Sequence, residues 1–133
     1  SLIDAEIKRG IDPSRIVVGG FSQGGALTQS LAATYEDNKL GGFVSLSGFM
    51  PVPKTLLKKR SEKNLETPVF LAHGSDDPVV PFEEIKNSKQ QLSDNFGFSD
   101  VEVHTYSGLP HSVCLPELED IFAFLEKVVP AKE

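Results

Sequence analysis

Short apolar runs alternate along the chain with longer stretches in which apolar residues recur at helical spacing. The runs predict strands at residues 15–20, 43–47, 68–72 and 101–106. The helical spacing predicts helices over residues 2–10, 23–35, 82–96 and 115–129, with one short helix within 54–66. Strands that alternate with helices favour a mainly parallel sheet with helices on both faces. We therefore expect an α/β fold without an internal linker long enough to divide it into two domains.

Two segments carry more specific expectations. The run Ile16-Val17-Val18 is consecutively apolar, which is typical of a strand buried on both faces of a parallel sheet. This pattern indicates a central strand, yet nothing before it can pair with one of its edges, and an uncovered apolar edge favours association. In the last helix the apolar residues at helical spacing are Leu118, Ile121, Phe122 and Leu125.

Charge and composition exclude several classes of function. The chain has 13 basic and 19 acidic residues, a formal charge of −6, which argues against the broad positive surface that nucleic-acid binding needs. Its one basic cluster, residues 58–60, lies beside Glu62 and Glu66 and is interpreted as a solvated segment. The acidic excess also disfavours attraction to an anionic membrane, and no run of about 18 apolar residues predicts a membrane span. Cys114 is the one cysteine, so no internal disulfide can form, which fits a reducing, cytoplasmic compartment.

The segment Gly20-Phe21-Ser22-Gln23-Gly24 has the pattern G-x-S-x-G between a predicted strand and a predicted helix. In that context the chain turns sharply and exposes the serine hydroxyl at the carboxyl edge of the sheet. We expect a side chain at Gly20 or at Gly24 to crowd the neighbouring backbone. The Gln23 N–H, at the start of the helix, can donate to an oxyanion formed at Ser22. The alternative is a glycine-rich turn that only packs tightly.

A serine hydroxyl is a poor nucleophile at neutral pH and needs a base beside it. Of the three histidines, His111 lies in a loop between the fourth strand and the last helix, from which an imidazole can reach Ser22. His104 lies in mid-strand, where a structural or surface position is expected. His73 closes the third strand and is interpreted as a support for the loop that follows. His111 is therefore the candidate base.

The base in turn needs an acid that orients it and stabilises the imidazolium formed during reaction. Asp76 and Asp77 both lie in the loop after the third strand. The order serine, aspartate, histidine along the chain is the order found in α/β-hydrolases. Position alone does not separate the two aspartates.

Three motifs, in this order, resemble those of the acyl-protein thioesterase, lysophospholipase and carboxylesterase family of α/β-hydrolases. They are residues 19–26 (GGFSQGGA), 73–81 (HGSDDPVVP) and 108–112 (GLPHS), and the resemblance runs through nearly the whole chain. In that family the acid lies four residues after the histidine of the H-G motif, which corresponds to Asp77. The resemblance therefore implies a catalytic triad of Ser22, Asp77 and His111.

The same resemblance implies a reaction and its substrates. Members of the family hydrolyse acyl thioesters on proteins, lysophospholipids or short esters, without a metal or other cofactor. Cys114 falls near a cysteine often found after the catalytic histidine in the family, and we interpret it as a buried, small apolar residue.

The chain departs from the family in one respect. Members carry a long additional segment before the first helix seen here, with early strands and a second oxyanion donor. We therefore expect residues 1–133 to form the C-terminal portion of a single α/β-hydrolase domain, as a fragment that lacks its N-terminal segment. The alternatives are a shortened variant and a chain whose remainder lies on another chain, and the uncovered strand edge makes a homo-oligomer plausible.

Two other functions fit the same residues. A general short-chain carboxylesterase would apply the same triad to a different substrate. A catalytically inactive fragment or binding module would keep the motifs without forming a site, and its Ser22 would not react with a fluorophosphonate. We favour a serine hydrolase that cleaves acyl thioesters or esters.

Overall fold

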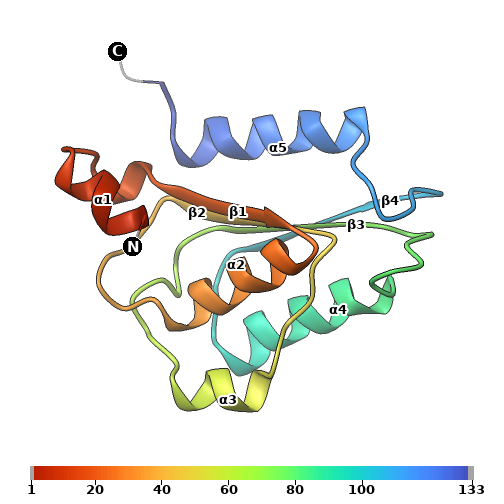
Figure 1. Cartoon of the computed structure of the whole chain (residues 1–133), viewed down its shortest axis with the longest axis horizontal. Helices are drawn as coiled ribbons and strands as arrows, with labels where there is room; N and C mark the ends of the chain where they lie inside the picture. Colours follow the sequence, from red (N-terminus) through yellow and green to blue (C-terminus); the bar gives the residue numbers. More distant parts are fainter. Residues whose placement is uncertain (1, 132–133) are drawn as a thin grey trace.

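Four parallel strands form one sheet in the computed structural model, which describes residues 2–131 (Figure 1). The strands are β1 (Val17–Phe21), β2 (Gly42–Leu46), β3 (Val69–Gly74) and β4 (Val101–Tyr106). Their order across the sheet is β1-β2-β3-β4, so each strand pairs with its successor in the chain. A crossover containing a helix joins every pair, as parallel pairing requires. The predicted parallel sheet is confirmed.

The helices also follow the expected order. They are α1 (Leu2–Lys8), α2 (Gln23–Thr34), α3 (Pro53–Lys58), α4 (Glu83–Gln90) and α5 (Leu115–Val128), with a 3₁₀ turn, η1, at Pro13–Arg15. The helix predicted over residues 82–96 is divided, because α4 ends at Gln90 and continues as one π-helical turn, η2 (Gln91–Asn95). Within the described residues no helix is both long and apolar enough to cross a bilayer.

Two layers of helices enclose the sheet. Figure 1 shows α2, α3 and α4 on one face and α5 on the other. Successive strand residues point to opposite faces, so Phe43 and Leu71 pack toward α2 and α4, whereas Val44 and Phe70 pack toward α5. The larger of the two cores includes the buried residues Ala33, Leu40, Met50, Leu92, Phe96 and Phe98.

Burial along β1 differs from the prediction. The central strands β2 and β3 are buried along almost their whole length, but no residue of β1 is fully buried, and Gly19 and Phe21 are exposed. The reason is its place in the sheet, since β1 is an edge strand that, among residues 2–131, pairs with β2 alone. The prediction of a strand buried on both faces is therefore wrong, whereas the uncovered edge is present.

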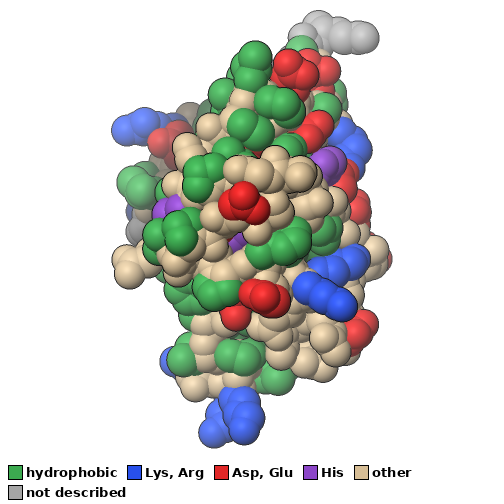
Figure 2. Space-filling view, turned by 90° about the vertical axis from the view of Figure 1, so that its right-hand side faces the viewer, with side chains coloured by type: hydrophobic (Ala, Val, Ile, Leu, Met, Phe, Trp, Pro, Cys, Tyr) green, Lys and Arg blue, Asp and Glu red, His purple; other side chains and the backbone are tan. Residues whose placement is uncertain are grey.

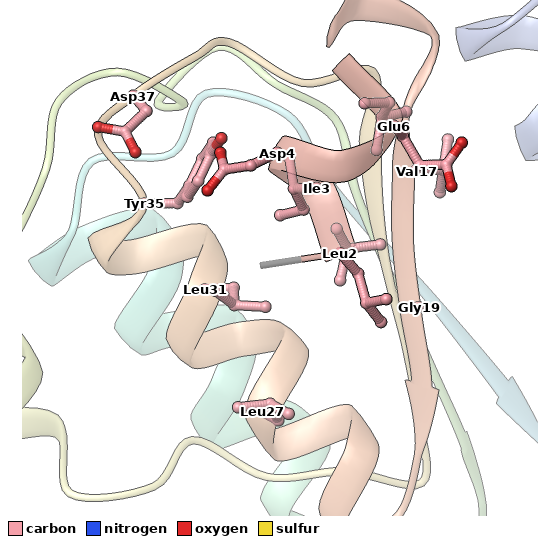
Figure 3. A pocket seen from close by; sticks show the side chains of 12 residues that line it. Leu2, Ile3, Asp4, Glu6, Val17, Gly19, Leu27, Leu31, Tyr35 and Asp37 are labelled. Atoms are coloured by element: carbon pink, nitrogen blue, oxygen red, sulfur yellow. The ribbon is translucent and has the colours of Figure 1, made fainter. Parts of the chain in front are cut away.

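A cavity of about 730 Å³ lies along this edge, between α1, β1 and α2 (Figure 3). Its lining is mainly apolar and includes Ile3, Val17, Leu27 and Leu31, with acidic side chains such as Asp37 at its margin. The cavity is continuous with the open sheet edge at β1.

The helix α5 presents only part of its apolar surface to the sheet. Ile121 and Leu125 pack against the core on this face, and Phe124 is buried beside Phe70. Leu118 and Phe122, which share the helical spacing of Ile121 and Leu125, are 42% and 63% exposed. The helix therefore carries two adjacent apolar faces, of which the sheet covers one.

Candidate active site

The segment between β1 and α2 forms a sharp turn at Ser22. Its backbone has φ 60° and ψ −115°, a conformation that side-chain-bearing residues rarely adopt. Two hydrogen bonds hold it, from Ser22 N–H to the Leu46 carbonyl at 2.8 Å and from Ala26 N–H to the Ser22 carbonyl at 3.1 Å. Strain of this kind persists only where the surrounding structure imposes it. The turn directs the segment away from the sheet and into the first turn of α2.

The two glycines of the G-x-S-x-G pattern are not equivalent. A Cβ at Gly20 would overlap the backbone of Gly24, so Gly20 is required for the close approach of strand and helix. A Cβ at Gly24 would meet nothing within 4 Å. The expectation of crowding is confirmed at Gly20 and wrong at Gly24, because a side chain at Gly24 would point into open space.

This difference predicts the effect of adding one methyl group at each position. Gly20→Ala should lower the free energy of unfolding by about 2–3 kcal/mol, since neither backbone segment can move away from the new atom. Gly24→Ala is the matched control and should leave stability unchanged or raise it by about 0.5–1 kcal/mol, because alanine favours helix over glycine. Urea unfolding of both variants measures the two values. Equal destabilisation of the two variants would contradict the different roles of Gly20 and Gly24.

Three loops at the carboxyl ends of β1, β3 and β4 bring the predicted site residues together. The His111 ring lies between the other two, with Nε2 2.9 Å from Ser22 Oγ and Nδ1 2.7 Å from Asp77 Oδ2. Ser22 and His111 are 89 positions apart in the sequence. Figure 2 views the molecule from this end, where histidine atoms reach the surface beside hydrophobic side chains.

The geometry assigns the protons of the His111 ring. Asp77 accepts hydrogen bonds, so Nδ1 carries a proton and donates it to Oδ2. The neutral ring then leaves Nε2 without a proton, and Ser22 Oγ–H donates to it. This is the arrangement in which an imidazole can remove a proton from a serine hydroxyl.

Asp77 is buried, with its carboxylate held on both oxygens. Oδ1 accepts the N–H groups of Val79 and Val80, both at 2.8 Å, while Oδ2 faces His111. Burial alone raises the pKa of Asp77, but the hydrogen bonds from His111, Val80 and Val79 outweigh it, so the pKa lies below its ordinary value. The carboxylate is thus ionised at neutral pH.

The neighbouring Asp76 has a different environment. Its side chain is exposed, and its Oδ1 accepts a hydrogen bond from Ser75 Oγ at 3.2 Å. Adjacent residues in this loop point in different directions, so only Asp77 reaches the imidazole. Of the two aspartates, Asp77 is therefore the one in contact with His111, and its role as the acid stays a prediction.

Of the other two histidines, one contacts the acid of this cluster, because His73 Nε2 lies 3.4 Å from Asp77 Oδ2. His73 is buried, and its Nε2 donates to the Val80 carbonyl at 2.9 Å, so it supports the loop that carries Asp77, as expected. His104 is half-buried on β4 and its Nε2 lies 2.9 Å from Glu102 Oε2. Neither ring contacts Ser22.

Gln23 is the first residue of the 12-residue helix α2, which begins directly at the serine. The N–H groups of a first helical turn have no partner within the helix, and they carry the positive end of the helix dipole. An oxyanion formed at Ser22 would therefore meet the Gln23 N–H and a favourable electrostatic potential. This position agrees with the expected role of Gln23, which stays a prediction.

Sequence reasoning missed one neighbour of the imidazole and misjudged another residue nearby. The Phe21 ring lies 4.7 Å from the His111 ring, centroid to centroid, and its place between Gly20 and the serine could have indicated this contact.

Cys114 was expected to be buried, but it is half-buried at the N-cap of α5, where its N–H donates to Glu117 Oε1 at 3.4 Å. The buried-residue interpretation of Cys114 is therefore wrong.

Comparison with known proteins agrees with these features. The family described as phospholipase/carboxylesterase matches residues 1–129. The acyl-protein thioesterase 1 of Kluyveromyces lactis is 42% identical over 130 residues, covering 97% of this chain and 57% of that protein. The acyl-protein thioesterase 1 of Gibberella zeae is 44% identical over 134 residues, covering 99% of this chain and 56% of that protein. The chain thus spans little more than half the length of these relatives.

Solved structures show the same backbone arrangement. SOBER1 from Arabidopsis thaliana superposes with a TM-score of 0.89 at 34% identity, covering 96% of this chain and 60% of that one. Acyl-protein thioesterase 2 from Zea mays gives a TM-score of 0.74 at 27% identity, with coverages of 96% and 64%. The arrangement of strands and helices around Ser22 is therefore shared with crystal structures of these proteins.

Proposed function

Because the chain belongs to the phospholipase/carboxylesterase family of α/β-hydrolases, we propose that it catalyses acyl-ester or acyl-thioester hydrolysis through Ser22, His111 and Asp77. One observation carries the proposal, namely the position of the His111 ring within hydrogen-bonding distance of both the Ser22 hydroxyl and the Asp77 carboxylate. Three loops distant in sequence supply these groups, an arrangement that packing alone does not require.

The reaction begins with attack of Ser22 Oγ on the acyl carbonyl carbon, while His111 Nε2 takes the hydroxyl proton. The new imidazolium is stabilised by Asp77, whose Oδ2 accepts the Nδ1–H. The Gln23 N–H donates to the oxyanion of the tetrahedral intermediate. When the intermediate collapses, its bond to the leaving thiol or alcohol breaks and His111 supplies the proton that the leaving group needs.

The second half repeats these steps with water. His111 removes a proton from water as the water oxygen attacks the acyl-serine, and the Ser22 oxygen then leaves and regains a proton from the imidazolium. The products are a free carboxylic acid and the original enzyme. No residue changes its net protonation over the whole cycle.

The relatives favour an S-acylated protein as substrate. Both fungal proteins compared above are acyl-protein thioesterases at more than 40% identity. A thiolate leaves more readily than an alkoxide, so a triad with the same groups hydrolyses thioesters and activated esters alike. The family description names phospholipases and carboxylesterases, so phospholipids and carboxylic esters are the second candidate class.

Labelling with a fluorophosphonate tests the proposal directly. Such a probe phosphonylates a serine whose hydroxyl is activated by a neighbouring base, and peptide mapping should locate one adduct, on Ser22. Hydrolysis of a thioester and an oxygen ester with the same acyl group then measures the preference between the two substrate classes. A folded protein that takes up no probe at Ser22 would support the inactive binding module instead.

A further inference from the structure

The loop that carries His111, residues 107–114, is fastened at both ends by one side-chain pair. Tyr106 is the last residue of β4, directly before the loop, and Asp120 lies in the second turn of α5, after it. The Tyr106 hydroxyl donates a hydrogen bond to Asp120 Oδ2 at 2.7 Å. This bond joins β4, after which the loop begins, to α5, at which the loop ends.

The backbone of Tyr106 also contacts the loop that carries the acid. Its carbonyl accepts the Ser75 N–H at 2.9 Å and the Leu109 N–H at 3.3 Å. Ser75 lies two residues before Asp77, and Leu109 lies two residues before His111. Tyr106 therefore connects the acid loop, the histidine loop and α5 at one point.

The environment of Tyr106 fixes the direction of this bond. Its ring packs against the core between the sheet and α5. Burial and the hydrogen bond to Asp120 raise the pKa of the Tyr106 phenol well above its ordinary value, so the hydroxyl is protonated at neutral pH and donates to the carboxylate. Asp120 Oδ2 also lies 3.6 Å from His104 Nδ1.

We propose that Tyr106, through its hydrogen bond to Asp120, is a positioning residue that holds His111 within reach of Ser22. The inference rests on the proposed function of the triad. A displacement of about 1 Å of a catalytic group lowers a reaction rate by about 10²-fold, so a bond that sets the ends of this loop affects the chemical step. The substrate does not contact Tyr106 in this role.

A second tie between α5 and β4 provides the control. Lys127 Nζ donates to Glu102 Oε1 at 2.6 Å, near the other end of the helix. Breaking this pair loosens α5 from the sheet but removes no contact of Tyr106 or of the histidine loop. Its one link to Asp120 runs through His104, which contacts both Glu102 and Asp120. Lys127→Met therefore reports what a purely structural loss does to the reaction.

The experiment compares Tyr106→Phe, Asp120→Asn and Asp120→Ala with wild type and Lys127→Met. Tyr106→Phe keeps the packed ring and removes only the hydroxyl, and Asp120→Asn keeps an oxygen that can accept the bond. For each variant we would measure kcat and KM for a short chromogenic ester, the rate of fluorophosphonate labelling, and the Tm.

We expect kcat and the labelling rate to fall about 10-fold in Tyr106→Phe and Asp120→Ala with KM unchanged, a milder effect than full misplacement because other bonds still hold the loop. Asp120→Asn, unlike Asp120→Ala, should retain most of the wild-type kcat. Lys127→Met should lower the Tm but keep the wild-type kcat.

Two kinds of failure are distinguishable. Wild type that hydrolyses the ester no faster than Ser22→Ala overturns the proposed function and this inference with it. Active wild type with an unchanged kcat in Tyr106→Phe, or an equal loss of kcat in Lys127→Met, overturns the inference alone.

Discussion

Replacing Ser22 with alanine should lower kcat/KM by about 10⁵-fold, because the nucleophile of the acyl-enzyme mechanism is lost and only binding and oxyanion stabilisation remain. His111→Ala should cause a loss of similar size, since an unactivated hydroxyl reacts very slowly. The double variant should be no slower than either single variant, because the two residues act as one unit. Initial rates with a chromogenic ester measure all three.

Ser30→Ala is the matched control for this prediction. Ser30 lies on the same helix, α2, and its hydroxyl donates only to the Ala26 carbonyl one turn earlier, at 3.1 Å. It should retain wild-type activity. Activity of Ser22→Ala equal to that of Ser30→Ala would exclude Ser22 as the nucleophile.

The second large effect is expected for Asp77→Asn, with a loss of about 10⁴-fold in kcat. The N–H groups of Val79 and Val80 retain the amide oxygen in the place of Oδ1, so the amide NH₂ would face His111. An NH₂ group donates, and His111 Nδ1 must then accept, which moves the ring proton to Nε2. The imidazole in that tautomer cannot take the proton of Ser22.

Asp76→Asn is the control, since the Asp76 side chain is exposed and bonded only locally, to Ser75. It should keep full activity. A large loss in Asp76→Asn, or none in Asp77→Asn, would contradict the assignment of the acid. Crystal structures of the two variants would show whether the loop keeps its conformation.

The lowered pKa of Asp77 also predicts a pH dependence of stability. A carboxyl whose folded-state pKa lies below its unfolded value stabilises the fold above the unfolded pKa, and this contribution is lost as the pH falls through the folded pKa. Wild type should therefore be more stable than Asp77→Asn at neutral pH, and the gap should close in acid. Denaturant unfolding at a series of pH values measures the gap. A gap that is constant with pH would contradict the lowered pKa.

Local patterns predicted the order of elements because strand and helix periodicities are properties of short segments. They did not predict how much of each element is covered. The apolar run at Ile16-Val17-Val18 would look the same at the start of a central strand and at the start of the edge strand β1. Likewise, the spacing of Leu118 and Phe122 is as regular as that of Ile121 and Leu125, and only the position of the sheet decides which pair packs against the core.

The candidate site likewise combines features that a short segment predicts with features that depend on distant parts of the chain. The G-x-S-x-G pattern is local, so the turn at Ser22 and the role of Gly20 were visible in the sequence. The choice of Asp77 needed the family resemblance, because two adjacent aspartates have no distinguishing local signal. The bond between Tyr106 and Asp120 joins a strand to a helix across a loop, and no short pattern marks such a pair.

The backbone conformation at Ser22 opposes the stability of the fold to the proposed catalytic role of the serine. At φ 60° and ψ −115° a serine is disfavoured by about 1–3 kcal/mol, whereas glycine adopts such angles with little penalty. A search for the most heat-resistant version of this chain would thus tend to replace Ser22 first. The fold retains a disfavoured residue at this position, and its hydroxyl is the nucleophile of the proposed reaction.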